Sequence, residues 1–254
     1  VGTEAGKNLT NAGINSVFVG FQAGYNATSS YSNIGVGYKS LYSLTNNGGW
    51  NVGAFNIAIG EETLYANKSG WNNIAIGYQT LKELTTGSNN IAIGGVRPLS
   101  SLTTGGYNIA IGDEVLEENI SGEGNVAIGY LSFANNTNSY NTALGYQTGA
   151  YSTTGTKNTA IGSDALGWFS EGSWNTAVGA DALGRNDGKS FANTAFGYQA
   201  GRAGSAGYAN ASSTWIGYQA GVAITTGSSN IALGYKAADN LTTGSNNIVI
   251  GYDI

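Results

Sequence analysis

The chain has 254 residues, a formal net charge of −5 at pH 7, 41 glycines, a single proline, and no cysteine, histidine or methionine. Without Cys and His it cannot form a disulfide, a Cys/His zinc cluster, or a Ser-His-Asp or Cys-His catalytic unit. Its acidic balance argues against nucleic acid as a partner, because phosphate binding needs clustered cations, and no apolar run reaches the length of a membrane-spanning segment.

One five-residue phrase returns fourteen times, in the form Asn, β-branched, Ala, apolar, Gly, as in Asn-Ile-Ala-Ile-Gly at 56–60. In chain order, the strands expected from this phrase are 16–20, 33–37, 56–60, 73–77, 90–94, 108–112, 125–129, 141–145, 158–162, 175–179, 193–197, 213–217, 230–234 and 247–251. We call the closing glycine of each phrase the anchor and count positions from it. Neighbouring anchors are most often 17 residues apart, and so short a period predicts a solenoid.

Each phrase alternates with period two, as a strand does. Position −4 is Asn in all copies except Ser16 and Ser213, position −3 is always β-branched, position −2 is Ala in ten copies, and position −1 is Val, Ile, Leu or Phe. We expect the large residues at −3 and −1 to fill the interior and the Ala and Asn columns to face outward. The small Ala side chains would then either receive a second chain or merely relieve crowding. The Asn column is either a hydrogen-bonded ladder or a ligand-facing row.

A second glycine column lies at −7, where we expect it to supply positive φ in a turn. The longer coils, the third near Trp50 and the twelfth around 206–211, are expected to bulge there. The chain is thus predicted to be all-β, a parallel β-solenoid (β-roll) of about 14 coils of about 17 residues, in a single elongated domain over 1–254. Because it begins at Val1 and ends just after the last phrase, we expect a fragment or processed part of a longer fibre.

The position directly after the anchor is aromatic in nine copies. Stacked rings there would either stabilise the roll or present a surface for a sugar or a protein partner. Two tryptophans in turns extend the same hypothesis, since exposed Trp often marks contact sites. The candidate ligand or partner surface comprises Tyr38, Tyr78, Tyr130, Tyr146, Tyr198, Tyr218, Tyr235, Trp71 and Trp174.

Carboxylate pairs are the remaining source of chemistry. The densest are Glu61-Glu62, Asp113-Glu114 and Glu117-Glu118, while Asp164 and Asp181 share a column in successive coils. Two stacked carboxylates supply too few ligands for Ca²⁺, and a solvated edge accounts for the others. We therefore expect no catalytic, cofactor or metal site and no enzymatic activity.

The phrase Asn-Ile-Ala-Ile-Gly, together with Ser132 three residues after the anchor Gly129, resembles the head repeats of trimeric autotransporter adhesins. The unit at 141–149 and the Thr-Thr-Gly-Ser-Asn-Asn spacer at 85–90 look like repeats of phage tail-fibre-like and bacterial surface proteins. The resemblance implies a left-handed β-roll, a homotrimer, a place outside the cell, at the cell surface or on a virion, and a glycan or host surface receptor as partner.

Three functions follow as hypotheses. The first is a non-enzymatic structural and adhesive segment of an extracellular or virion fibre. The second is an ice-binding solenoid, suggested by Thr142, Thr159, Thr176, Thr194 and Thr214 in consecutive coils, although we expect these threonines to share a face with the core column. The third is the subunit of a self-assembling surface filament.

Overall fold

The computed structural model describes residues 1–10, 15–28, 31–45, 52–168, 171–185, 190–203 and 210–254. The chain divides into two compact units, Val1–Val126 and Ala127–Ile254, and the division falls within β7 (Val126–Ile128). Each unit is all-β, and both are parallel β-solenoids, so the predicted fold class is confirmed. The single domain over 1–254 and the handedness stay predictions. The bulge expected at Trp50 and most of the one expected at 206–211 lie outside the described residues.

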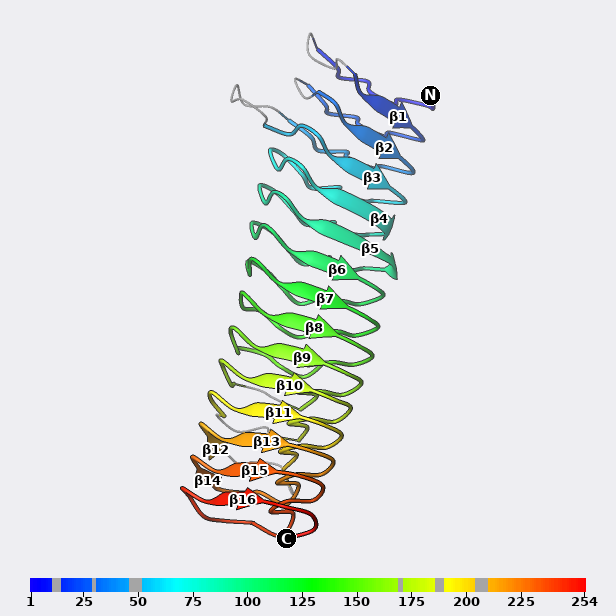
Figure 1. Ribbon diagram of the computed structural model, residues 1–254. Helices are drawn as coiled ribbons and strands as arrows, with labels where there is room; N and C mark the ends of the chain where they lie inside the picture. Colours follow the sequence, from blue (N-terminus) through cyan, green and yellow to red (C-terminus); the bar gives the residue numbers. More distant parts are fainter. Residues whose placement is uncertain (11–14, 29–30, 46–51, 169–170, 186–189, 204–209) are drawn as a thin grey trace. The chain divides into compact units, whose positions relative to one another are not determined.

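In the first unit the strands pair in chain order, and they are β1 (Val17–Val19), β2 (Ile34–Val36), β3 (Ile57–Ile59), β4 (Ile74–Tyr78), β5 (Ile91–Val96) and β6 (Ile109–Ile111). Residues pair one repeat apart, as Ile57 does with Ile74. Each predicted phrase thus becomes one rung of a parallel ladder (Figure 1).

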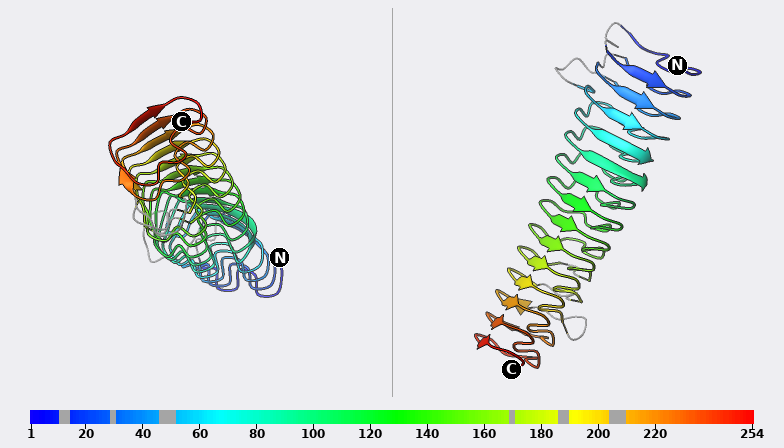
Figure 2. Two further views of the ribbon diagram at one scale, coloured as in Figure 1. Left: turned by 90° about the horizontal axis from the view of Figure 1, so that it is seen from below. Right: turned by 45° about the vertical axis from the view of Figure 1, so that its right-hand side comes forward.

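The second unit repeats the pattern with β8 (Thr142–Leu144), β9 (Thr159–Ile161), β10 (Thr176–Val178), β11 (Thr194–Phe196), β13 (Thr214–Ile216), β15 (Ile231–Leu233) and β16 (Ile248–Ile250). A separate two-stranded sheet joins β12 (Asn210–Ala211) to β14 (Gly227–Ser228). Within each unit the strands lie side by side, and the rest of each coil returns behind them (Figure 2).

The expected orientation of the strands was wrong. All ten Ala residues at −2 are at most 1 % exposed, and the Asn column beside them is likewise almost wholly buried as far as Asn230. The β-branched and apolar residues at −3 and −1 instead face outward, and none of them is buried. Val17, for instance, is 50 % exposed and Leu144 is 47 % exposed.

The opposite wall of the coil explains this inversion. Four residues after the anchor, leucines such as Leu41, Leu64 and Leu81 point inward and are 0 % exposed, and small residues at +3, such as Thr63 and Thr80, are buried beside them. A coil of about 17 residues leaves a narrow interior, and native interiors pack at crystal-like density. With Leu coming from one wall, only Ala fits on the other.

Coils in which position −2 is large and position +4 is small support this account. Trp215 replaces Ala at −2 and is 0 % exposed, and glycines take the Leu position beside it. A Cβ on Gly201 or Gly221 would lie 2.4 or 2.3 Å from the Trp215 ring. Phe18 likewise occupies the space left by Gly24, whose Cβ would lie 2.5 Å from the Phe18 ring. Large and small residues alternate so that the interior stays filled.

The anchor glycines are required by both conformation and space. Gly60 has φ +130°, and a Cβ there would lie 1.9 Å from the carbonyl oxygen of Gly77 in the next coil. That conformation is readily adopted only by glycine. The second glycine column is only partly as expected. Gly53, Gly227 and Gly244 have positive φ. Gly70, Gly87 and Gly105 do not, but a Cβ on each of these three would lie 2.1–2.2 Å from the carbonyl oxygen of the next glycine in the column.

The Asn column forms the hydrogen-bonded ladder and not a ligand-facing row. The backbone N–H and the side-chain amide of Asn73 both donate to Oδ1 of Asn56, at 3.0 and 3.1 Å. The same side-chain amide also donates to the carbonyl of Gly87 in the next coil, at 3.0 Å. Because buried polar groups are costly unless paired, this ladder fixes the register of successive coils.

Candidate functional site

The aromatic column after the anchors lies on the surface, half exposed, and its rings stack between coils. Phe21 and Tyr38 stack at 5.5 Å between ring centroids, and Tyr130 and Tyr146 at 5.6 Å. In the second unit Tyr198, Tyr218, Tyr235 and Tyr252 form a continuous stack with spacings of 5.2, 5.2 and 4.9 Å. Six of the seven predicted tyrosines are thus in stacks, while Tyr78, 43 % exposed, extends β4 and pairs with Val96.

A second aromatic stack, which the sequence argument missed, lies five residues after the anchors. Tyr25, Tyr42 and Tyr65 stack at 5.1 and 5.0 Å. The Nζ of Lys39 lies 5.1 Å from the Tyr38 ring and 5.8 Å from the Tyr42 ring, so one lysine joins the two aromatic columns by cation–π contacts. The recurrence of Tyr at this position in three successive coils was the available signal.

The two predicted tryptophans lie apart from these stacks and from each other. Trp71, half-buried, donates its backbone N–H to Oγ of Ser88 at 3.1 Å. Trp174 is 57 % exposed and meets Phe191 in a tilted contact at 6.3 Å. The structure therefore does not bring the nine predicted residues together into one site.

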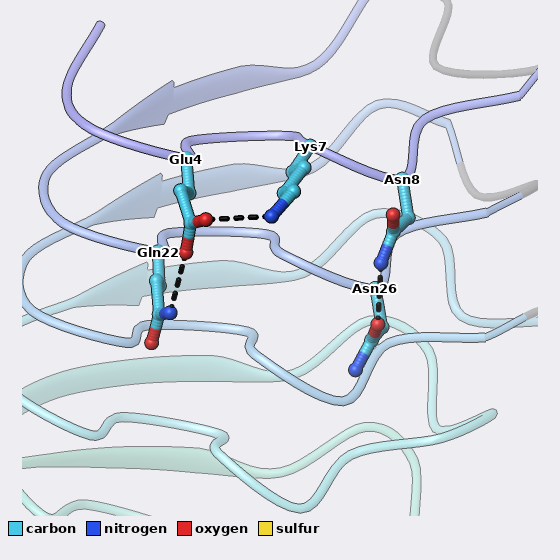
Figure 3. A network of polar contacts seen from close by, with 5 residues as sticks. All are labelled: Glu4, Lys7, Asn8, Gln22 and Asn26. Carbon is cyan, nitrogen blue, oxygen red and sulfur yellow. Dashed lines mark hydrogen bonds and ion pairs between the residues drawn. The ribbon is translucent and has the colours of Figure 1, made fainter.

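Polar side chains on the surface form a further set of contacts within and between coils. At the start of the first unit, Glu4 accepts from Nε2 of Gln22 at 2.7 Å and pairs with Lys7 at 2.6 Å, while Asn8 donates to Asn26 (Figure 3). Later in this unit, Gln79 donates to Glu62 at 3.0 Å. These hydrogen bonds join neighbouring coils on the surface, where their contribution to stability is modest.

Some of the acidic residues form ion pairs with nearby cations. Glu62 forms an ion pair with Lys82 at 2.9 Å, and the hydrogen bond from that ammonium is the main cause that lowers the pKa of Glu62. Glu117 pairs with Arg97 at 3.0 Å, yet burial raises its pKa. Among the described residues, no three acidic side chains gather as a metal site would require.

A hollow of about 340 Å³ interrupts the aromatic column of the second unit. It lies where Ser163 and Ala180 replace tyrosine in two successive coils, after Tyr146 and before Tyr198. Asp164, Asp181 and Trp168 also line it. Of the nine predicted residues, Tyr198 lines this hollow, and the gap in the tyrosine column is readable in the sequence.

No protein-family model, curated protein or solved structure matches the chain. The part of the chain that the structure describes contains no helix long and apolar enough to cross a membrane. The functional argument therefore depends on the surfaces of the molecule.

Proposed function

We propose that the chain is a non-enzymatic structural and adhesive segment of an extracellular or virion fibre, and that it associates as a homotrimer. The observation that carries this proposal is the outward face formed by positions −3 and −1 of the strands, which we call the β-branched face. It combines apolar side chains with a regular parallel sheet, as on β3 and β4, where Ile57 lies beside Ile74 and Ile59 beside Ile76.

The size of this face supports association. Three strand residues span about 10 Å and neighbouring strands lie about 4.8 Å apart, so the six strands β1 to β6 present roughly 300 Å² of mostly aliphatic surface. This is about the size of the largest apolar patch on a typical monomer, and such patches are often functional. A groove runs along the edge of this face, between the −5 and −3 positions of three coils, and would receive side chains of a second copy. It is lined by Phe55, Ile57, Asn72, Ile74, Asn89 and Ile91.

The filled interior also favours covering the β-branched face with a second chain, because the face cannot be buried by refolding the coil. The Ala and Leu columns already fill each coil, so the β-branched face cannot be covered by folding inward. An identical copy presents the same ladder with the same spacing, and its side chains would interdigitate with this face within each unit. A second chain was one of the two explanations considered for the Ala column. Because that column is buried, the proposal places the second chain on the opposite face of the strands.

Light scattering coupled to size exclusion tests the proposal at micromolar concentration. We expect a trimer mass for the wild type and a monomer mass for the double variant Ile74→Lys, Ile93→Lys, with an unchanged circular dichroism spectrum because both side chains point outward. Thr104→Lys, on an exposed position outside the face, should remain trimeric. A wild-type monomer would contradict the trimer, and a mass that grows with concentration would indicate a filament instead.

Ice binding is a second candidate, because the structure removes the objection to it. The five threonines from Thr142 to Thr214 lie on the exposed side of the sheet and not in the core, and Thr142, Thr159, Thr176, Thr194 and Thr214 pair in register along consecutive strands. Large residues such as Phe196 stand beside them. Thermal hysteresis measured on the wild type and on Thr176→Val would decide this, and no hysteresis in the wild type would exclude it.

A further inference from the structure

The hollow in the aromatic column has the shape left by missing rings. Tyr198 begins the stack that continues through Tyr218, with 5.2 Å between ring centroids. In the two preceding coils Ala180 and Ser163 occupy the same column, and both line the hollow. Two rows of the column therefore lack a ring, and Tyr146 and Tyr198, which flank the gap, are three strand spacings of about 4.8 Å apart.

A tryptophan forms a second aromatic wall of the hollow. Trp168 is 55 % exposed and stacks on Tyr151 with 4.3 Å between centroids and 23° between planes. This contact holds the indole in place while leaving half of its surface accessible. The hollow thus offers two immobilised aromatic side chains to a ligand, and neither needs to be ordered on binding.

The polar lining retains unused hydrogen-bonding capacity. Oδ2 of Asp164 accepts from Oγ of Ser163 at 2.8 Å, which leaves Oδ1 as an acceptor. Oδ2 of Asp181 accepts from Nε2 of Gln199 at 3.1 Å and lies 2.6 Å from Nε of Arg202. Nε of Arg202 makes no hydrogen bond despite this short distance, and the terminal nitrogens of Arg202 remain as donors.

The charges of the lining balance, since Arg185 and Arg202 oppose Asp164 and Asp181. A balanced set favours a neutral ligand over an anion or a cation. Flat apolar walls combined with carboxylate acceptors and guanidinium donors match a pyranose ring, whose C–H faces pack on aromatic rings and whose hydroxyl groups both donate and accept.

We propose that this hollow binds a neutral pyranose at the end of a glycan, with the sugar ring continuing the aromatic stack in the space left by Ser163 and Ala180. Trp168 and Tyr198 supply the packing surfaces, and Asp164 and Arg202 contact the hydroxyl groups. The proposal deepens the adhesive role by naming its ligand class, but it needs only one chain. If no sugar binds, the trimer proposal is unaffected. If the protein is a monomer, the hollow is still present and sugar binding can still be tested.

Titration of the full chain with methyl pyranosides of glucose, galactose and mannose tests the proposal. Tryptophan fluorescence and saturation-transfer NMR report binding. A ligand of this size in an open hollow should bind with a dissociation constant in the millimolar range. We expect at least one neutral pyranoside to bind and Trp168→Ala to weaken it by about tenfold or more. Trp174→Ala, which removes an equally exposed tryptophan elsewhere in the same unit, should bind as the wild type does.

Ala180→Tyr is the variant that separates binding from folding. It restores the residue type found in most copies of the column, so it should fold and melt at or above the wild-type temperature while filling the hollow and abolishing binding. The proposal is overturned if no pyranoside binds at 100 mM (about a hundred times the expected constant), or if binding survives both Trp168→Ala and Ala180→Tyr. It is also overturned if a glucuronide or inorganic sulfate binds more tightly than every neutral sugar.

Discussion

Replacing Asn90 by Ala should show how much one rung of the Asn ladder contributes to stability. Oδ1 of Asn90 accepts from the backbone N–H and from the side-chain amide of Asn108, both at 3.0 Å, and its own amide donates to Gly105 at 3.1 Å. Truncation removes these bonds and leaves the Asn108 N–H and the Gly105 carbonyl buried and unpaired. At about 1–3 kcal/mol for each orphaned group, we expect a loss of about 4 kcal/mol.

Asn90→Ser provides the matched control, because serine already occupies this column. Oγ of Ser213 accepts from the backbone N–H of Asn230 at 3.1 Å, so a serine at 90 should retain the bond to Asn108 and cost about half as much as alanine. Urea unfolding followed by circular dichroism gives the free energies, and hydrogen exchange at the Asn108 amide reports the rung directly. Equal losses below about 1 kcal/mol for both variants would refute the reasoning.

Three further predictions concern glycine, core volume and pH. Gly60→Ala should cost about 3 kcal/mol or more. Gly95→Ala needs no positive φ, and its Cβ would lie 3.1 Å from the Asp113 oxygen that accepts from the Gly95 N–H, so it should cost less, about 1 kcal/mol, in the same urea assay. Trp215→Ala should cost about 3–5 kcal/mol, and adding Gly221→Leu should recover part of this, since Leu is the usual residue in that column; additive losses would contradict the volume exchange. The pKa of Glu62 is lower in the folded protein than in the unfolded chain, so the charged carboxylate stabilises the fold at pH values above the unfolded-state pKa. This stabilisation is lost as the pH falls through the folded-state pKa. Glu62→Gln should therefore destabilise the protein by less than about 1 kcal/mol at pH 7 and have no effect on unfolding at pH 2.

The strands, their parallel order and their register could be predicted from the repeat, because each position of the repeat keeps the same type of residue in successive coils. Alternation alone distinguishes two faces of a strand but not which of them is inside. The volumes at −3 and −1 suggested an apolar interior there, whereas the buried Leu column at +4 decides otherwise. The pairing of Trp215 with Gly201 and Gly221 was the sequence signal that links −2 to +4 across the core.

The candidate site could be predicted only in part. The Tyr column is visible in the sequence, and the charged residues Glu61 and Asp113 in the same position indicate that it is exposed. The expected stacks are present. The hollow at Ser163 and Ala180 depends on how the chain at Trp168 returns beside the column, which no pattern of period 17 specifies. Trp168 interrupts the repeat, and its stacking on Tyr151 required coordinates to be seen.

The register of the ladder also determines how far the chain must search to fold. Each strand residue pairs with one about 17 positions away, as Ile74 does with Ile57, so partners are separated by about 0.07 of the chain length, a value typical of helical bundles and less than half that of β-sandwiches. Every new coil needs only the preceding one as its template. A protein made of parallel β-strands, ordinarily slow to form, should therefore fold by rapid growth from any nucleated pair of coils, and removing one whole repeat should leave that growth intact.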